Sequence, residues 1–251
     1  MPLQTYMKQI SIHMNSTLKT LLVILLFAPF ASFAQLSGSY TIGGTSPDYS
    51  TISAAISALN SSGINGPTTF NIASGTYPEK LIIGPVTGVS NTNQITFQSA
   101  SQDSSTVIIT ALSSASGTAN YTVLLNGCSY INLKHLTIER TGQSAYARVI
   151  DMQSSVSRIH IENCQIKGDQ VSSTSGFTSL VHSQNTNSNK PSHIYLQYNK
   201  FINGSYAISI QGITASAGNY ATNVVITNNI LTGQYRTGIY LAYQDGPLIN
   251  H

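Results

Sequence analysis

The amino-acid sequence predicts an all-β fold, a parallel β-helix. Four segments in the second half alternate apolar and polar residues, turn a corner and resume the alternation, as two consecutive strands would. Their first inward residues lie at 131, 159, 194 and 224, so the intervals are 28, 35 and 30 residues. A strand pattern repeated within about 20 to 50 residues indicates a solenoid of stacked coils. The segments are Ile131–Ile138, Ile159–Ile166, Ile194–Phe201 and Val224–Leu231.

The composition supports a folded solenoid and argues against several partners. Only 8% of the 251 residues are charged and 41% are hydrophobic, which is not the composition of a disordered chain. Lys8 and Lys19 lie in a segment that we expect to be removed, which leaves 11 − 2 = 9 Lys and Arg against 8 Asp and Glu. A nearly neutral surface provides no field to hold nucleic acid or an acidic membrane, so we expect neither partner.

Residues 1–34 have the features of a signal peptide. An apolar run over 21–27 is followed by small residues at Ser32 and Ala34, which suit cleavage after Ala34. Translation from Met14 would still give a complete signal, and an uncleaved anchor is the alternative. The run is short for a membrane span, and no later segment could cross a bilayer. We therefore expect a secreted or outer cell-surface protein without a span after signal removal.

The mature domain, 35–251, should begin with a strand at Ser39–Ile42 and then form a helix over 50–59. Apolar residues recur there at helical spacing, with Ser50 or Asp48 as the N-terminal cap. Gly63 and the cluster Asn65-Gly66-Pro67 should end the helix. A helix before the first coil would cover the open end of the core. The apolar helix positions are Ile52, Ala55, Ile56 and Leu59.

Further strands complete the walls of the coils, and variable loops such as 172–175 and 184–191 explain the uneven intervals. At the carboxyl end, a strand at Gly238–Leu241 is followed by a turn, with no segment that closes the core. We therefore expect the chain to be the front portion of a longer protein. The further strands are Thr68–Ile72, Lys80–Ile83, Gln94–Gln98, Thr106–Thr110, Thr122–Leu125, Val149–Met152, Ser179–His182 and Ala207–Ile210.

Stacking in register predicts a single inward file formed by Leu136, Cys164, Asn199 and Asn229. The two asparagines should hydrogen bond to each other and to corner backbone groups, because buried polar groups need partners. On the outside, Glu139 should face Lys167. Cys164 then packs as a small apolar group, so we expect it and Cys128 to be buried free thiols, with a disulfide between them as the alternative.

Two blocks carry a family resemblance. Ser50–Ile56 and the run Phe70–Lys80, which contains Gly75-Thr76-Tyr77-Pro78-Glu79, resemble the amino-terminal coil of the pectin-lyase-like superfamily. The resemblance implies a right-handed parallel β-helix. The opening from Gly38–Gly44 to Ile95–Ala100 is also similar to large surface proteins exported by the type IX secretion system, which implies a place at the cell surface.

The sequence lacks the catalytic motifs that enzymes of that superfamily use. Pectinesterases need Q-A-V-A, D-F-I-F-G and Q-G-R type motifs, and the sequence has none of them. Glu79 matches only the fold-forming part of the pattern, so we expect a structural role at a sharp turn. Lyases of this fold commonly use calcium held by clustered aspartates. Asp151 and Asp169 are the candidates for such a site, converging with Glu162, and calcium would be the cofactor only if the chain is a lyase.

A candidate binding groove lies on one outer face. The outward residues His160 and Tyr195 share one row and Lys134 and Glu162 the next, with Arg158 just before His160. A tyrosine ring offers a sugar an apolar platform with a polar tip. The alternative is an ordinary polar sheet face. The other histidines, His182 and His193, lie too far apart in the sequence to indicate a site.

We therefore expect a non-enzymatic module that binds carbohydrate, such as a cell-surface glycan, or another partner in adhesion. The alternative is a polysaccharide lyase or carbohydrate esterase that acts on an acidic, pectin-like polysaccharide. Both share the fold, and the fold alone does not decide the function.

Overall fold

The computed structural model describes residues 34–142, 145–183, 189–213, 218 and 220–250. The chain divides into two units, Met1–Ala34 and Gln35–His251, and the description below concerns the second. The predicted signal peptide, 1–34, lies outside the described residues except for Ala34. Among the residues described, no helix is both long enough and apolar enough to cross a membrane.

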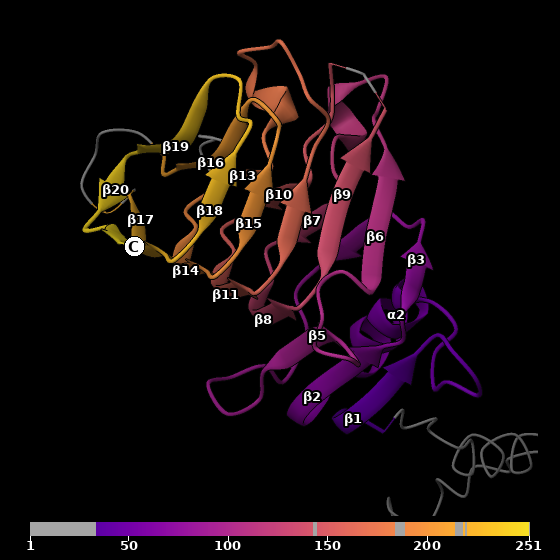
Figure 1. The fold of residues 1–251 in the computed structure, drawn as a ribbon. Helices are drawn as coiled ribbons and strands as arrows, with labels where there is room; N and C mark the ends of the chain where they lie inside the picture. The colour runs from indigo at the N-terminus through magenta and orange to yellow at the C-terminus, as the bar shows by residue number, and fades with distance from the viewer. Residues whose placement is uncertain (1–33, 143–144, 184–188, 214–217, 219, 251) are drawn as a thin grey trace, which may run out of the picture. The chain divides into compact units, whose positions relative to one another are not determined.

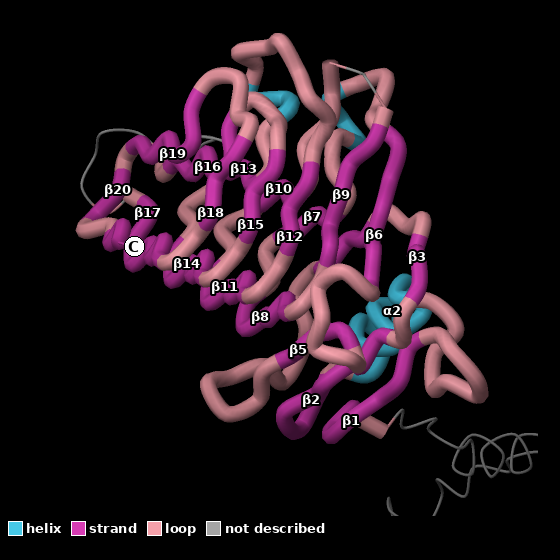
Figure 2. The backbone as a smooth tube through the Cα atoms, viewed as in Figure 1, coloured by secondary structure: helices cyan, strands magenta, loops and turns pink. Residues whose placement is uncertain are grey.

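The second unit is a right-handed parallel β-helix of about six coils, as the sequence predicts (Figure 1). Each coil runs through a strand of sheet A, a strand of sheet B and a strand of sheet C, and every strand pairs in parallel with the equivalent strand of the next coil (Figure 2). In the part of the chain that the structure describes, sheet A has nine strands in the order β1-β2-β5-β8-β11-β14-β17-β20, with β21 paired to β17 as well. Sheets B and C have six described strands each.

The strand bounds are as follows. Sheet A contains β1 (Leu36–Ile42), β2 (Ile64–Ile72), β5 (Ile95–Ser99), β8 (Ser129–Lys134), β11 (Ser157–Glu162), β14 (Ser192–Gln197), β17 (Ala221–Thr227), β20 (Gln244–Asp245) and β21 (Leu248–Asn250). Sheet B contains β3 (Gly75–Tyr77), β6 (Val107–Leu112), β9 (Thr137–Thr141), β12 (Gln165–Lys167), β15 (Lys200–Ile202) and β18 (Ile230–Thr232). Sheet C contains β4 (Leu81–Ile83), β7 (Val123–Asn126), β10 (Ile150–Gln153), β13 (Val181–Ser183), β16 (Tyr206–Gln211) and β19 (Thr237–Ala242).

The four patterned segments align as their spacing predicts. Ile131 pairs with Ile159, Ile159 with Ile194, and Ile194 with Val224, and all four side chains are buried. Since every second residue of a strand points inward, this register places one continuous apolar core inside the coils. Part of the predicted loop 184–191, residues 184–188, lies outside the described residues.

The capping helix α2 (Ile52–Ser62) begins and ends later than predicted. All four predicted apolar positions are buried, and the helix packs against β1, β2 and β4 at the start of the solenoid. Its N-cap is Thr51, whose hydroxyl accepts from the amide of Ala54, and neither Ser50 nor Asp48 caps it. Gly63 ends the helix with a φ of 65°, as expected, but the cluster after it belongs to strand β2 and not to a turn.

Glu79 has a structural role that differs from the predicted one. Its carboxylate accepts hydrogen bonds from the backbone amides of Ile52 at 3.2 Å and Ser53 at 2.9 Å, and from the Ser53 hydroxyl. An anion at a helix N-terminus pairs with free amides and with the positive end of the helix dipole. Glu79 therefore fixes α2 to the first coil, and the Gly75–Tyr77 part of the same motif forms strand β3.

The predicted inward file lies at the corner between sheets A and B. Leu136, Cys164 and Asn199 are buried, and Asn229 is partly buried. The Asn199 amide nitrogen donates to Asn229 Oδ1 and to the Ile161 carbonyl, while its oxygen accepts from the Cys164 amide. Both cysteines are buried free thiols. On the outer surface of sheet B, Lys167 Nζ lies 3.5 Å from Glu139 Oε2, as the register predicts.

Candidate functional site

The outer face of sheet A carries two rows of side chains, one residue from each coil in each row. Strand pairing places Asn132, His160, Tyr195 and Val225 in the first row. The second row consists of Lys134, Glu162, Gln197 and Thr227. Neighbours within a row are about 4.8 Å apart because that is the spacing of paired strands. Four of the five residues predicted to bind carbohydrate therefore adjoin one another on this face.

His160 and Tyr195 form a stacked pair at the centre of the first row. Their ring centroids are 4.3 Å apart and the planes meet at 17°. Each ring covers a face of the other, so the pair presents ring edges, with the tyrosine hydroxyl and the imidazole nitrogens. Burial lowers the pKa of His160, and the nearby Lys134 cation lowers it further, against a smaller opposing effect of Glu162. The imidazole is therefore mainly neutral at pH 7.

Lys134 and Glu162 form an ion pair beside the aromatic stack. The Nζ atom lies 3.0 Å from Oε2, and each side chain retains about a third of its exposure. A pair this exposed contributes only about 0–1 kcal/mol to stability. Breaking it so that Lys134 or Glu162 can bind a ligand therefore costs little. In the same row, the Gln197 amide donates to the Thr227 hydroxyl at 3.0 Å.

Arg158 lies near the start of strand β11 in sheet A, outside the two rows. It has a positive φ of 53°, and its guanidinium lies 5.1 Å from the centre of the Tyr130 ring. His193 and Asn223 share this left-handed conformation in the next two coils, and their side chains hydrogen bond at 3.1 Å. His193, which its sequence position alone does not mark as a site residue, therefore belongs with Arg158 to the line of residues that borders the face.

A second line of left-handed residues borders the face at the corner with sheet B. His135, Asn163, Tyr198 and Asn228 have φ between 53° and 56° and stand in consecutive coils. Next to them lies a groove of about 540 Å³, here called the corner groove. It is lined by Gln102, Asp103, Ser104, His135, Asn163, Cys164, Gln165, Tyr198 and Lys200.

The corner groove was not predicted, because left-handed backbone is signalled in a sequence mainly by Gly and Asn, whereas histidine and tyrosine occupy two of its corner positions. In the sequence, the only indication of left-handed backbone at these corners is the pair of asparagines at equivalent positions, Asn163 and Asn228. Tyr198 is 56% exposed, so most of its ring faces solvent. The groove thus combines an aromatic ring, amides, a carboxylate and an ammonium group, the set of side chains that recognises sugars by stacking and hydrogen bonds.

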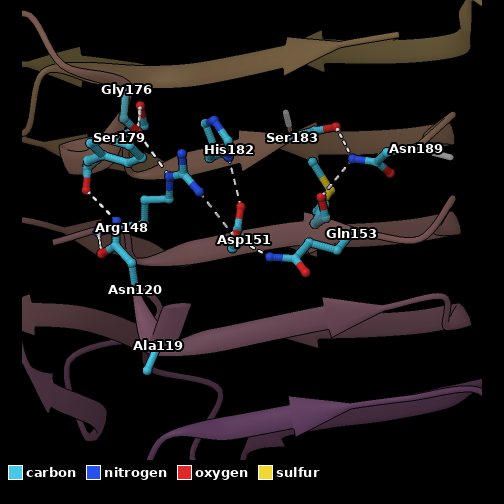
Figure 3. A network of polar contacts seen from close by, with 12 residues as sticks. Ala119, Asn120, Arg148, Asp151, Gln153, Gly176, Ser179, His182, Ser183 and Asn189 are labelled. Carbon is cyan, nitrogen blue, oxygen red and sulfur yellow. Dashed lines mark hydrogen bonds and ion pairs between the residues drawn. The ribbon is translucent and has the colours of Figure 1, made fainter. Parts of the chain in front are cut away.

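A buried polar network lies on sheet C, around the calcium candidate Asp151 (Figure 3). His182 Nδ1 lies 2.7 Å from Asp151 Oδ1, and Arg148 Nη1 lies 3.4 Å from Asp151 Oδ2. The Gln153 amide donates to the same oxygen at 2.8 Å. Asp151, Arg148 and His182 are only 2%, 6% and 3% exposed, so the three groups interact with little screening by water.

The segments that cover sheet C are tied to this network. Arg148 Nε donates to the Gly176 carbonyl at 3.0 Å, and the guanidinium lies 5.2 Å from the centre of the Phe177 ring. Asn120 accepts from the Arg148 amide and donates to the Phe177 carbonyl, both at 2.8 Å. Burial lowers the pKa of Arg148, opposed by Asp151, and burial also lowers the pKa of His182, opposed by its hydrogen bond with Asp151.

Strand pairing extends this site into a third coil. Asp151 pairs with His182, and His182 pairs with Ser209, which is 3% exposed. The three residues therefore form one row, in the order carboxylate, imidazole and hydroxyl. The imidazole nitrogen not used by Asp151, Nε2, lies beside Gly176 of the covering segment. His182, which its place in the sequence did not connect to any other candidate, thus contacts Asp151, 31 positions away, across one coil.

The predicted calcium ligands do not come together. Glu162 lies on sheet A and Asp151 on sheet C, while Asp169 follows strand β12 of sheet B. Burial and the charge of Glu139 raise the pKa of Asp169. Asp151 is bound to His182 and Arg148 instead. Within the described ranges, no group of three or more His, Cys, Asp or Glu side chains is placed to hold a metal ion.

No protein-family model matches the sequence, and no curated protein matches it. Three similar solved structures are pectin methylesterases. That of Aspergillus niger is 17% identical, with 85% of this chain and 87% of that chain covered and a TM-score of 0.40. PemA of Erwinia chrysanthemi is 14% identical over 80% and 68%, with a TM-score of 0.47. One in complex with a hexasaccharide is 15% identical over 84% and 68%, with a TM-score of 0.45. At these values, the similarity extends to the course of the backbone and no further.

Proposed function

We propose that this protein binds an extended acidic polysaccharide along the outer face of sheet A. The observation that supports the proposal is the pair of adjoining rows, in which the His160–Tyr195 stack lies beside the Lys134–Glu162 ion pair. Polar groups repeated at about 4.8 Å along a rigid face suit a polymer that itself repeats. The cationic groups of Lys134 and Arg158 would attract carboxylates, and the ring edges and amides would hydrogen bond hydroxyls.

The test compares polymers and variants by affinity electrophoresis. Polygalacturonate, methyl-esterified pectin and neutral dextran are cast into native gels, and retention of the protein is measured in each. We expect retention by the acidic polymers, about tenfold weaker binding for Tyr195→Ala, and no change for Tyr240→Ala, an outward tyrosine of sheet C. Equal retention of the Tyr195→Ala variant and the unaltered protein would contradict the proposal.

A second candidate function, a carbohydrate esterase, rests on strand register, which sets Asp151, His182 and Ser209 at equivalent positions of three consecutive coils. In this function Ser209 Oγ attacks the ester carbonyl, and His182 takes the hydroxyl proton and passes it to the departing methanol. Water then hydrolyses the acyl-serine. Asp151 holds the imidazole through the 2.7 Å contact at Nδ1, which leaves the opposite nitrogen to act as the base.

Methanol release from methyl-esterified pectin tests this second function. Pectin is chosen because it is the polymer named for the similar solved structures. We expect release by the unaltered protein, its loss in Ser209→Ala, and its persistence in Ser157→Ala, a serine on sheet A. An unaltered protein that releases no methanol would exclude the esterase function, and activity in Ser209→Ala would exclude the serine as the nucleophile.

Membership of the pectin-lyase-like superfamily, export by the type IX system and a role in adhesion at the cell surface are further parts of the proposal. They rest on the sequence motifs and on the signal-like residues 1–34. Amino-terminal sequencing of the exported protein is expected to begin at Gln35, and a start at an earlier residue would contradict this cleavage site.

A further inference from the structure

The corner groove has a wall that is held rigidly against the coils. The segment between β5 and β6 forms this wall. Its Ser104 carbonyl accepts from the Thr137 hydroxyl at 2.7 Å, and its Ser104 hydroxyl accepts from the Gln165 amide at 3.2 Å. Since two coils hold one residue of the wall, the neighbouring Asp103 has a fixed place at the edge of the groove.

One end of the groove carries a negative charge. The Asp103 carboxylate accepts from the amide and from the hydroxyl of Ser105, both at 2.8 Å. These hydrogen bonds lower the pKa of Asp103, so the carboxylate remains ionised in mildly acidic as well as neutral solution.

The other end of the groove carries a positive charge. Lys200 is exposed, and none of the ion pairs between described residues includes it. It stands at the start of β15, beside the exposed ring of Tyr198. Ser104, the neighbour of Asp103, reaches Gln165, and Gln165 pairs with Lys200, so Lys200 lies one coil beyond the point that the wall contacts.

We propose that the corner groove is a second carbohydrate site, for a short uronate oligosaccharide whose carboxylate binds Lys200 and whose uncharged end lies at Asp103. This inference rests on the proposed function for the class of ligand. The sugar next to the carboxylate packs on the Tyr198 ring, and the amides of Asn163 and Gln165 face the hydroxyls between the two ends. Asp103 accepts hydrogen bonds from hydroxyls and repels a second carboxylate.

The separation of charges makes the groove selective for the pattern of esterification. A fully de-esterified oligomer places a carboxylate at Asp103, where like charges repel, whereas a methyl ester or a neutral sugar is accepted there. A fully esterified oligomer has no carboxylate for Lys200. The groove should therefore prefer a partly esterified oligomer to both extremes.

Calorimetric titration with trigalacturonate in its free, partly methyl-esterified and fully methyl-esterified forms tests the inference. We expect the partly esterified trimer to bind most tightly. Lys200→Met should weaken it by about tenfold, whereas Lys190→Met, a change at an exposed lysine of another loop, should not. Asp103→Asn should strengthen only the fully de-esterified trimer, by about three- to tenfold, and Asp245→Asn should change nothing.

Two outcomes would overturn the inference: no titration heat with any trimer, or an affinity for the fully de-esterified trimer that is the same in Asp103→Asn and in the unaltered protein. Retention of the protein in polymer gels, measured beside trimer binding, shows whether the corner groove or the face of sheet A binds carbohydrate. If Tyr195→Ala loses retention and Lys200→Met changes no trimer affinity, the face of sheet A binds the polymer and the groove does not. If the trimers bind as expected and Tyr195→Ala keeps its retention, the groove is the binding site and the proposed face is wrong.

Discussion

The side-chain nitrogen of Asn199 lies 3.1 Å from Oδ1 of Asn229, one coil further along the solenoid. The same oxygen of Asn229 accepts from the backbone amide of Asn199 at 2.9 Å. Toward the preceding coil, Asn199 bonds the Cys164 amide and the Ile161 carbonyl. The Asn199 side chain thus bonds polar groups of both neighbouring coils inside a mostly apolar core.

Replacing Asn199 by alanine should destabilise the protein strongly. The change leaves the Cys164 amide and the Ile161 carbonyl without their partner in the core, and each orphaned group costs about 1–3 kcal/mol. We expect a loss of about 3 kcal/mol in the free energy of unfolding, measured by urea denaturation. The control is Asn91→Ala, at an exposed asparagine, which should change it by less than about 0.5 kcal/mol.

The contact of Glu79 with helix α2 predicts a smaller effect. Glu79→Ala removes the acceptor of the Ile52 and Ser53 amides at the start of the helix. Because that end of the helix is solvent-accessible at Ser53, water replaces part of the lost bonding, and we expect a loss of about 1 kcal/mol. Thermal unfolding followed by circular dichroism measures it. The control is Glu139→Ala, which removes a carboxylate on sheet B. If Glu79→Ala unfolds at the same midpoint temperature as Glu139→Ala, the contact with helix α2 contributes nothing.

The lowered pKa of His182 predicts that stability decreases in acid. An unfolded histidine has a pKa of about 6.5, and burial places the folded value below it. Between the two values the unfolded chain binds more protons, so the free energy of unfolding is fully present above about pH 6.5 and falls as the pH decreases through the folded pKa. Asp151 and Arg148 are the charged groups that face the ring.

His182→Gln isolates this effect, because glutamine can still donate to Asp151 and does not titrate in this range. Urea denaturation of both proteins at several values from pH 7.5 to 5 should give a smaller decrease for the variant. Parallel curves for the two proteins would assign the acid sensitivity to other groups, such as His160.

Burial raises the pKa of both Cys128 and Cys164 to about 12, because the thiolate is poorly solvated in the core. We therefore expect no reaction with iodoacetamide at pH 8 in the folded protein and alkylation of both thiols in 8 M urea, followed by mass spectrometry. If neither thiol reacts in urea until a reductant is added, the two cysteines are bridged.

Alternation with period two predicted strands of all three sheets because inward residues repeat in every coil, although the short strand β3 was not among them. Helix α2 was predicted from its four buried residues, but its cap was not, since Asp48 is occupied by the amide and hydroxyl of Thr41. Where a contact joins distant positions, the pattern gave less information. Asp151 and His182 meet only because the loops between them bring β10 and β13 into register, and no repeated motif on sheet C signals that register.

The corners between sheets A and B have the same length in four consecutive coils, with two residues between the strands at 135–136, 163–164, 198–199 and 228–229. The connections from sheet B to sheet C in the same coils vary from three residues, 203–205, to thirteen, 168–180. An inserted residue at an A–B corner would break the line of left-handed residues and shift the asparagine pair out of alignment. Changes in loop length are therefore tolerated next to sheet C. The A–B corners, which carry the corner groove, must keep their length so that the coils stay in register.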